Sequence, residues 1–174
     1  PLMEDQMEML ACFPEMKDVS LFGVYDGHGG SFTSDYVKQH MIRIIESMHW
    51  FHFYKNLPAQ SLRDAPMGLE ILKQIMTDSF VAIDREMLSE VHETRWRDID
   101  IRTHKKKLDE SGCTCCIVLI TPKHIICANA GDPRACYCTG GEVVQLSLDH
   151  KPHHAAEQKR IEEDPTQNHD AYDL

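Results

Sequence analysis

Apolar and polar residues alternate near the start of the chain, as they do in a strand with one buried face. The alternation is loose over 6–13, and after a turn the segment 19–25 forms a mostly apolar run that stops at Asp26. These two segments predict a β-hairpin. A hairpin folds its start back beside its end, so we expect Glu4 and Asp5 to lie near Asp26.

Two longer segments place apolar residues three and four positions apart, which is the spacing of an amphipathic helix. The first helix is predicted over 32–48, with Ser31 as its N-cap. The second follows Pro66 and extends to Val91, and its methionine and aromatic side chains are expected to contact the core. The aromatic segment 49–58 between the two helices predicts an irregular connector packed on the core.

After residue 110 the pattern changes to short strands separated by turns that contain glycine and proline, which predicts a β-meander. Its four strands are expected over 113–121, 124–130, 134–138 and 142–146. A short charged helix is predicted over 155–163, where Glu157 and Arg160 are three positions apart and able to pair.

Two polar segments are predicted to lie in solvent. The segment 96–107 is charged and ends in Lys105-Lys106-Lys107, so we expect a solvated loop. The last segment, 164–174, is polar and is expected to be loosely held.

Length and composition limit the classes of protein that this chain can represent. A chain of 174 residues with 42% hydrophobic and 26% charged residues is typical of one soluble globular domain. The formal net charge of -10 argues against broad binding to nucleic acids or anionic membranes, which requires a positive field. No apolar run is as long as a membrane span, and the start does not resemble a signal peptide. The odd number of cysteines, seven, predicts reduced thiols and a cytoplasmic or nuclear location, or both.

The glycine-rich segment Asp26-Gly27-His28-Gly29-Gly30 combines a hard oxygen ligand with a group that titrates near neutral pH. That combination suits a divalent cation with a proton donor beside it. Carboxylates gathered at one end of a sheet repel one another unless cations lie between them. The same segment also fits a tight strand-to-helix turn that carries an Asx-type hydrogen bond and a surface histidine.

Five sequence blocks occur in a fixed order along the chain. They are Met3-Glu4-Asp5, Phe22-Gly23-Val24-Tyr25-Asp26-Gly27-His28-Gly29-Gly30, Ser111-Gly112-Cys113-Thr114, Ala128-Asn129-Ala130-Gly131-Asp132-Pro133-Arg134 and Leu146-Ser147-Leu148-Asp149-His150-Lys151-Pro152. The set resembles the metal-dependent serine/threonine phosphatases of the PP2C type. The resemblance implies an α+β fold, an antiparallel β-sandwich flanked by α-helices, with a metal site at one end of the sheets. It also implies hydrolysis of phosphoserine and phosphothreonine in phosphoprotein substrates.

The resemblance assigns metal roles to the acidic residues. The family uses two Mg²⁺ or Mn²⁺ ions, bridged by an aspartate and by the water that attacks phosphorus, and Asp26 matches this aspartate. The carbonyl group of Gly27 matches a neutral ligand, and Glu4 and Asp5 match an acidic pair that holds the ions directly or through water. Asp132 matches a position that is linked to a third ion in some members. Paired cations of this kind lower the pKa of the water and stabilise the displacement.

The resemblance also implies that His28 is the general acid that protonates the departing serine or threonine oxygen, which a histidine can do near pH 7. The chain departs from the family pattern in Pro133 and Cys113, where serine is usual. The arginine that usually precedes the Met-Glu-Asp block has no counterpart, and nothing after Arg160 resembles the later Asp-Gly and Asp-Asn blocks.

The departures lead to three expectations about this chain. We expect one PP2C-like domain over 1–174 that stops before the later metal-binding blocks. Alone, the chain is expected to bind metal weakly and to hydrolyse slowly or not at all, because two divalent ions need several anionic ligands. Open sheet edges are expected to favour self-association.

Other classes of function remain open from the sequence. A truncated or degenerate phosphatase-like domain would act as a binding module without turnover. The cysteine spacings lack the paired gaps of structural zinc sites, and the strand alternation explains these cysteines as small core residues. The histidines His150, His153 and His154 predict a solvated loop, although a metal-storage role is a remoter alternative.

Overall fold

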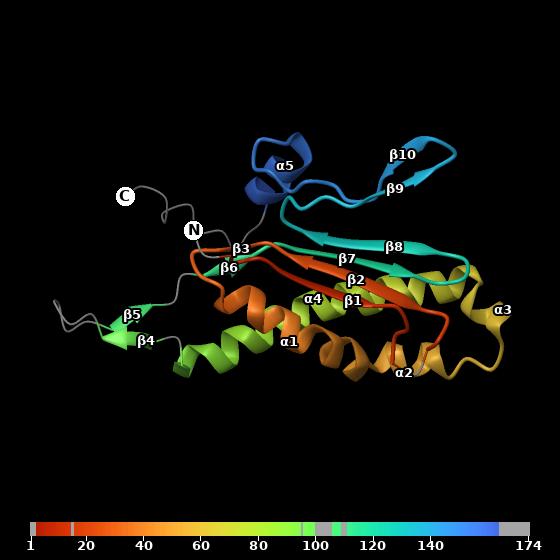
Figure 1. The fold of residues 1–174 in the computed structure, drawn as a ribbon, viewed down its shortest axis with the longest axis horizontal. Helices are drawn as coiled ribbons and strands as arrows, with labels where there is room; N and C mark the ends of the chain where they lie inside the picture. Colours follow the sequence, from red (N-terminus) through yellow and green to blue (C-terminus); the bar gives the residue numbers. More distant parts are fainter. Residues whose placement is uncertain (1–2, 15, 95, 100–105, 109–110, 164–174) are drawn as a thin grey trace.

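A four-stranded antiparallel sheet is the centre of the computed structural model, which describes residues 3–14, 16–94, 96–99, 106–108 and 111–163. The strand order is β1-β2-β7-β8, so β1 and β8 are the two edges of the sheet (Figure 1). The strands are β1 (Gln6–Leu10), β2 (Ser20–Tyr25), β7 (Cys115–Ile120) and β8 (Ile125–Ala130).

The predicted N-terminal hairpin is confirmed. Strands β1 and β2 pair from Gln6 opposite Tyr25 to Leu10 opposite Leu21. The backbone N–H of Phe13 donates to the carbonyl oxygen of Val19 at 2.6 Å, and both side chains are buried. The connection is therefore anchored in the core.

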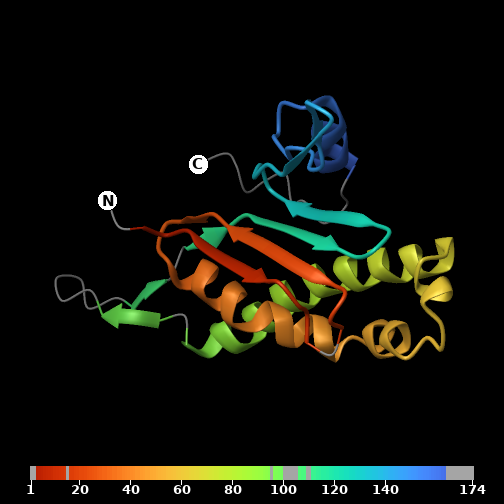
Figure 2. The same ribbon diagram turned by 45° about the vertical axis from the view of Figure 1, so that its right-hand side comes forward.

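Helices cover one face of the sheet, as Figures 1 and 2 show. They are α1 (Phe32–Ser47), α2 (His49–Lys55), α3 (Gln60–Arg63) and α4 (Pro66–Thr94). The two long helices, α1 and α4, confirm the helical spacing read from the sequence. Within the described residues, no helix is both long enough and apolar enough to span a membrane.

Two details of the helical layer differ from the predictions. The segment 49–58 is not wholly irregular, because His49–Lys55 forms α2 and buries Phe51 and Tyr54, which are three positions apart and share one helix face. Ser31 does occupy the N-cap position of α1, but its side chain makes no capping hydrogen bond.

Successive side chains of the central strands point to opposite faces of the sheet, and both faces are apolar. The inner face packs on the helices and includes Leu21, Tyr25 and Ile117, none of which is exposed to solvent. The outer face is also apolar, but much of it is exposed to solvent. Its side chains include Met7, Met9, Phe22, Val24, Ile120 and Ile125. The exposed fractions of Met9 and Val24 are 66% and 51%, so this face is largely open in the structure.

Three small sheets lie around the central one. Strand β3 (Gly27–His28) pairs with β6 (Gly112–Cys113), and β9 (Cys136–Thr139) pairs with β10 (Glu142–Gln145). Strand β8 does not continue into β9 in one sheet, so the predicted meander is two separate hairpins. The helix α5 (Ala155–Glu163) confirms the last predicted helix and lies with β9 and β10 beyond β8 (Figures 1 and 2).

The predicted solvated loop over 96–107 is wrong in part. Strands β4 (Trp96–Ile99) and β5 (Lys106–Leu108) pair as an antiparallel hairpin, so cross-strand hydrogen bonding overrides the charged composition. Lys105 and the segment 164–174 lie outside the described residues.

The α+β class and the helix-flanked antiparallel sheet are confirmed, and the described residues form part of such a domain. On the side of the sheet away from the helices, the segment that follows β8 lies against part of the outer face.

The expectation that the cysteines are core residues holds for Cys115 and Cys116, which are buried, but is wrong for Cys136 and Cys138. Those two lie in the β9–β10 hairpin, in which every strand residue is exposed.

Candidate active site

Asp5 and Asp26 line one cavity of about 410 Å³ at the end of the central sheet. The hairpin register brings them together, because Gln6 lies opposite Tyr25 and the next residues outward are Asp5 and Asp26. The remaining walls come from the outer face of the sheet and from the segment that follows β8. They include Phe22, Val24, Cys116, Val118, Pro133, Arg134 and Ala135.

Gly27 permits the close approach of the chain start to the sheet. A Cβ atom at this position would lie 2.2 Å from the carbonyl oxygen of Glu4 and 2.8 Å from Oγ of Ser34. Ser34, which is fully buried, donates a hydrogen bond of 2.5 Å to the same Glu4 oxygen. Glu4 is therefore anchored by its backbone, and its side chain is not among those that line the cavity.

The short β3–β6 pair fixes the position of His28. Gly112 lies opposite His28, and a Cβ atom on Gly112 would lie 2.6 Å from Cε1 and Nε2 of the imidazole. The ring thus rests on the backbone of β6, where only glycine leaves room for it. The histidine residue itself is exposed to solvent, so its ring can meet a ligand from outside.

The Ser111-Gly112-Cys113-Thr114 block ties the Asp26 segment to helix α1. The backbone N–H of Thr114 donates to the carbonyl oxygen of Asp26 at 2.8 Å, and Oγ1 of Thr33 donates to the carbonyl oxygen of Ser111 at 2.9 Å. Burial, with a smaller contribution from the negative charge of Asp26, raises the pKa of Cys113 to about 11. Cys113 is therefore a neutral thiol at pH 7 and serves packing.

Asp132 belongs to an ion-pair network beside the cavity. Its Oδ2 atom lies 3.3 Å from Nζ of Lys151, which is also 3.8 Å from Oδ2 of Asp149. Arg134 binds Asp149 with two nitrogens, from Nε to Oδ1 at 3.0 Å and from Nη2 to Oδ2 at 2.7 Å. Arg134 holds the pKa of the Asp149 carboxyl below its ordinary value, with smaller effects from Lys151 and His154.

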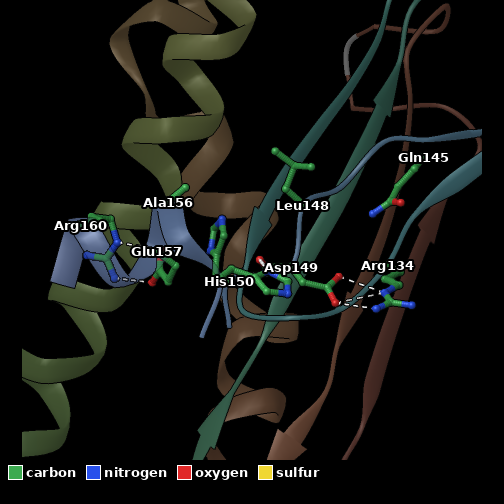
Figure 3. Close-up of a pocket in the computed structure, with 9 residues that line it drawn as sticks. Arg134, Gln145, Leu148, Asp149, His150, Ala156, Glu157 and Arg160 are labelled. Carbon is green, nitrogen blue, oxygen red and sulfur yellow. Dashed lines mark hydrogen bonds and ion pairs between the residues drawn. The ribbon is translucent and has the colours of Figure 1, made fainter. Parts of the chain in front are cut away.

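A second cavity of about 600 Å³ separates this network from helix α5 (Figure 3). The Arg134–Asp149 pair forms one end of it, and the Arg160–Glu157 pair, with Nη2 to Oε1 at 2.6 Å, forms the other (Figure 3). The Glu157–Arg160 pair was expected from sequence and is confirmed. His150 and His154 line the cavity between the two ion pairs, and Nδ1 of His154 lies 3.1 Å from the carbonyl oxygen of Asp149.

The donor atoms at the Asp5–Asp26 cavity are of the right kind for a divalent cation. Carboxylate oxygens suit Mg²⁺ and Mn²⁺, and Mg²⁺ commonly keeps several waters while binding through one or two carboxylates. Two such carboxylates share the cavity. Among the described residues, however, no group of three or more His, Cys, Asp or Glu side chains is gathered to hold a metal ion. The residues present therefore fit a partly hydrated cation better than a closed cage for two.

Comparison with known proteins assigns this arrangement to a family. The model of the family protein phosphatase 2C matches residues 2–169. The chain belongs to the protein phosphatase 2C family. Protein phosphatase 1L of Bos taurus is 32% identical over 160 residues, which cover 91% of this chain and 38% of that protein. Protein phosphatase 2C 56 of Arabidopsis thaliana is 34% identical over 151 residues, which cover 86% of this chain and 30% of that protein.

Solved structures share the fold of this PP2C chain. The serine-threonine phosphatase 2C from Toxoplasma gondii matches with a TM-score of 0.71 and 21% identity, over 92% of this chain and 50% of that structure. A C. elegans sex determining protein matches with a TM-score of 0.65 and 23% identity, over 94% of this chain and 35% of that structure. The chain thus spans half or less of each of these relatives.

The structure brings together some of the predicted site residues and separates others. Asp5 and Asp26 share a cavity, Gly27 and His28 follow directly on β3, and Glu4 contacts Gly27 through its backbone. Asp132 is paired with Lys151 and is not among the residues that line the cavity. The catalytic and metal roles of these residues stay predictions.

Sequence reasoning gave no role to Arg134, which lines the same cavity as Asp26. The sequence block 128–134 contains Arg134, but the orientation of this arginine depends on a contact with Asp149, fifteen positions away. No local periodicity predicts such a contact between two segments outside regular elements.

Proposed function

We propose that this chain forms the metal-binding end of a PP2C phosphatase domain that hydrolyses phosphoserine and phosphothreonine in proteins. The observation that supports this proposal most strongly is the shared cavity of Asp5 and Asp26, with the exposed His28 two residues after Asp26. The protein phosphatase activity is supported by membership of the family, and the Mg²⁺ or Mn²⁺ dependence by the hard oxygen donors at the cavity.

In this proposal Asp26 and Asp5 hold the cation, and the Gly27 carbonyl group is a neutral ligand. When bound, a divalent cation lowers the pKa of a water and stabilises negative charge at the phosphoryl group. Glu4 acts mainly by placing Asp5, since its carbonyl oxygen accepts from Ser34. His28 protonates the departing serine or threonine oxygen, and the β6 backbone beneath its ring restricts where that ring can lie.

Hydrolysis of p-nitrophenyl phosphate in the presence of Mn²⁺ tests the proposal. We expect slow release of p-nitrophenol, because few carboxylates among the described residues are gathered to hold the cation, and this release depends on Mn²⁺ and falls to the level of buffer in the Asp26→Asn variant. Asp84→Asn is the matched control, because Asp84 is an exposed aspartate on helix α4. Hydrolysis that survives Asp26→Asn, or that needs no divalent cation, would contradict the proposal.

A binding module without turnover is the second candidate. It is favoured by the lack, among the described side chains, of a group of three metal ligands. In that case the chain would bind a phosphothreonine peptide in preference to the unphosphorylated peptide but release no phosphate from it. Phosphate release measured on the same peptide separates the two functions.

A further inference from the structure

We propose that Arg134 forms a subsite for the phosphate group of the substrate, in the cavity that Asp5 and Asp26 line. This inference rests on the proposed function and adds to it a residue that contacts the phosphate. Arg134 is the one cationic side chain among the described residues that line this cavity. A phosphate monoester carries nearly two negative charges at pH 7, so two carboxylates in the same cavity repel it unless positive groups face it.

The guanidinium group of Arg134 is held in one orientation. Its Nε and Nη2 atoms both donate to Asp149, whose side chain is only 5% exposed. The side chain of Arg134 itself is 69% exposed, so the guanidinium group reaches solvent while the carboxylate that orients it does not. A phosphate ligand would therefore meet a donor group that is already in place.

The orientation leaves donors for a ligand. In the part of the chain that the structure describes, Nη1 of Arg134 makes no hydrogen bond, and it lies on the side of the guanidinium away from Asp149 (Figure 3). Of the five N–H donors of a guanidinium, Asp149 takes one on Nε and one on Nη2, so two on Nη1 and one on Nη2 remain for phosphate oxygens.

Arg134 belongs to a network of two cations and two anions. Nζ of Lys151 lies 3.8 Å from Asp149 and 3.3 Å from Asp132, so Lys151 is held mainly by Asp132 and Arg134 mainly by Asp149. Arg160 is likewise paired with a carboxylate, that of Glu157, but it lines only the second cavity, which contains neither Asp5 nor Asp26. Arg134 is thus the arginine that combines a fixed orientation with a place in the cavity of Asp5 and Asp26.

The test uses a fluorescein-labelled phosphothreonine peptide and its unphosphorylated twin, titrated with the chain in the presence of Mg²⁺ and followed by fluorescence anisotropy. Arg134→Gln is expected to weaken binding of the phosphopeptide roughly ten- to a hundredfold, because a charge-assisted hydrogen bond is lost. Arg134→Lys should restore only part of the affinity, since an ammonium group lacks the planar fork.

Asp149→Asn is the decisive companion variant. This variant breaks the same ion pair but keeps the guanidinium group, so we expect the affinity for the phosphopeptide to fall only about threefold. Arg43→Gln, which removes an arginine paired with Glu86 in the helical layer, should leave binding unchanged. Thermal unfolding of each variant checks that it is folded and that Arg134→Gln and Asp149→Asn lose similar stability.

Each outcome decides the question. Equal losses of phosphopeptide affinity in Arg134→Gln and Asp149→Asn would mean that the ion pair is merely structural. Unchanged affinity in Arg134→Gln would also overturn the subsite. In both cases Mn²⁺-dependent hydrolysis that is abolished by Asp26→Asn would leave the proposed function standing. A wild-type chain that neither prefers the phosphopeptide nor hydrolyses p-nitrophenyl phosphate would overturn both proposals.

Discussion

Replacement of Gly27 by alanine is expected to separate the chain start from the end of β2 and so to open the Asp5–Asp26 cavity. The new Cβ atom would lie 2.2 Å from the carbonyl oxygen of Glu4 and 3.0 Å from its carbonyl carbon. These are backbone atoms, which cannot rotate away as the end of a flexible side chain can. The chain start therefore has to move, and with it Asp5.

The magnitude follows from two contributions. Overpacking of one methyl group against backbone costs about 1–3 kcal/mol of unfolding free energy. Displacement of Glu4 also breaks the 2.5 Å hydrogen bond from Ser34, which contributes about 1 kcal/mol. We expect a total loss of about 2–4 kcal/mol, which corresponds to a fall in Tm of roughly 4–16 °C for a chain of this size.

Urea and thermal unfolding, followed by circular dichroism, measure this loss. Gly140→Ala is the control, because nothing lies within 4 Å of a Cβ atom there and the cost is limited to the left-handed backbone, about 1 kcal/mol. Gly27→Ala should remain destabilising when combined with Ser34→Ala, since the 2.2 Å contact with Glu4 persists. A Gly27→Ala variant within about 0.5 kcal/mol of the wild type, or one rescued by Ser34→Ala, would refute the reasoning.

Three further predictions concern metal affinity, thiol reactivity and stability against acid. Asp5→Asn should weaken Mn²⁺ binding in calorimetry about tenfold and more than Glu4→Gln does, because Asp5 lines the cavity and Glu4 contributes its backbone. Alkylation of Cys113 by iodoacetamide, followed by mass spectrometry of its peptide, should speed up about tenfold per pH unit from pH 7 to 10, since its pKa is about 11. Hydrogen bonds from Arg43 and Tyr36 lower the pKa of Glu86, despite an opposing effect of burial. The resulting stability, about 0.5–1.5 kcal/mol, is present above the unfolded pKa near 4.5 and decreases as the pH falls through the lower folded pKa. Glu86→Gln should therefore lower the urea midpoint more at pH 7 than at acidic pH.

The parts of the fold that sequence could predict are those that repeat a simple period. Alternation predicted the β1–β2 hairpin, and the spacing of three and four predicted α1 and α4. The nearness of Asp5 and Asp26 then followed without any knowledge of the rest of the fold, because hairpin pairing fixes which residues face each other at its open end. This part of the site is local, within one supersecondary unit.

The parts that sequence could not predict depend on contacts between distant segments. The short helix α2 has only seven residues, too few to be distinguished from an aromatic connector by periodicity. The charged β4–β5 hairpin carries no alternation of apolar and polar residues that would have marked its strands. The orientation of Arg134 arises from its ion pair with Asp149, in a loop fifteen residues later. The sequence does not show where either side chain points.

The apolar outer face of the sheet and the candidate site are one continuous surface, since Phe22, Val24 and Val118 belong to both. Any polypeptide that covers this face also removes water from around Asp5 and Asp26. Removing water from around a charged carboxylate costs free energy unless a cation neutralises the charge. With less water present, the attraction between the carboxylate and the cation is also less screened. Covering the face and binding the cation therefore favour each other, and the coupling works equally in both directions. Mn²⁺ affinity should accordingly rise when the outer face is covered.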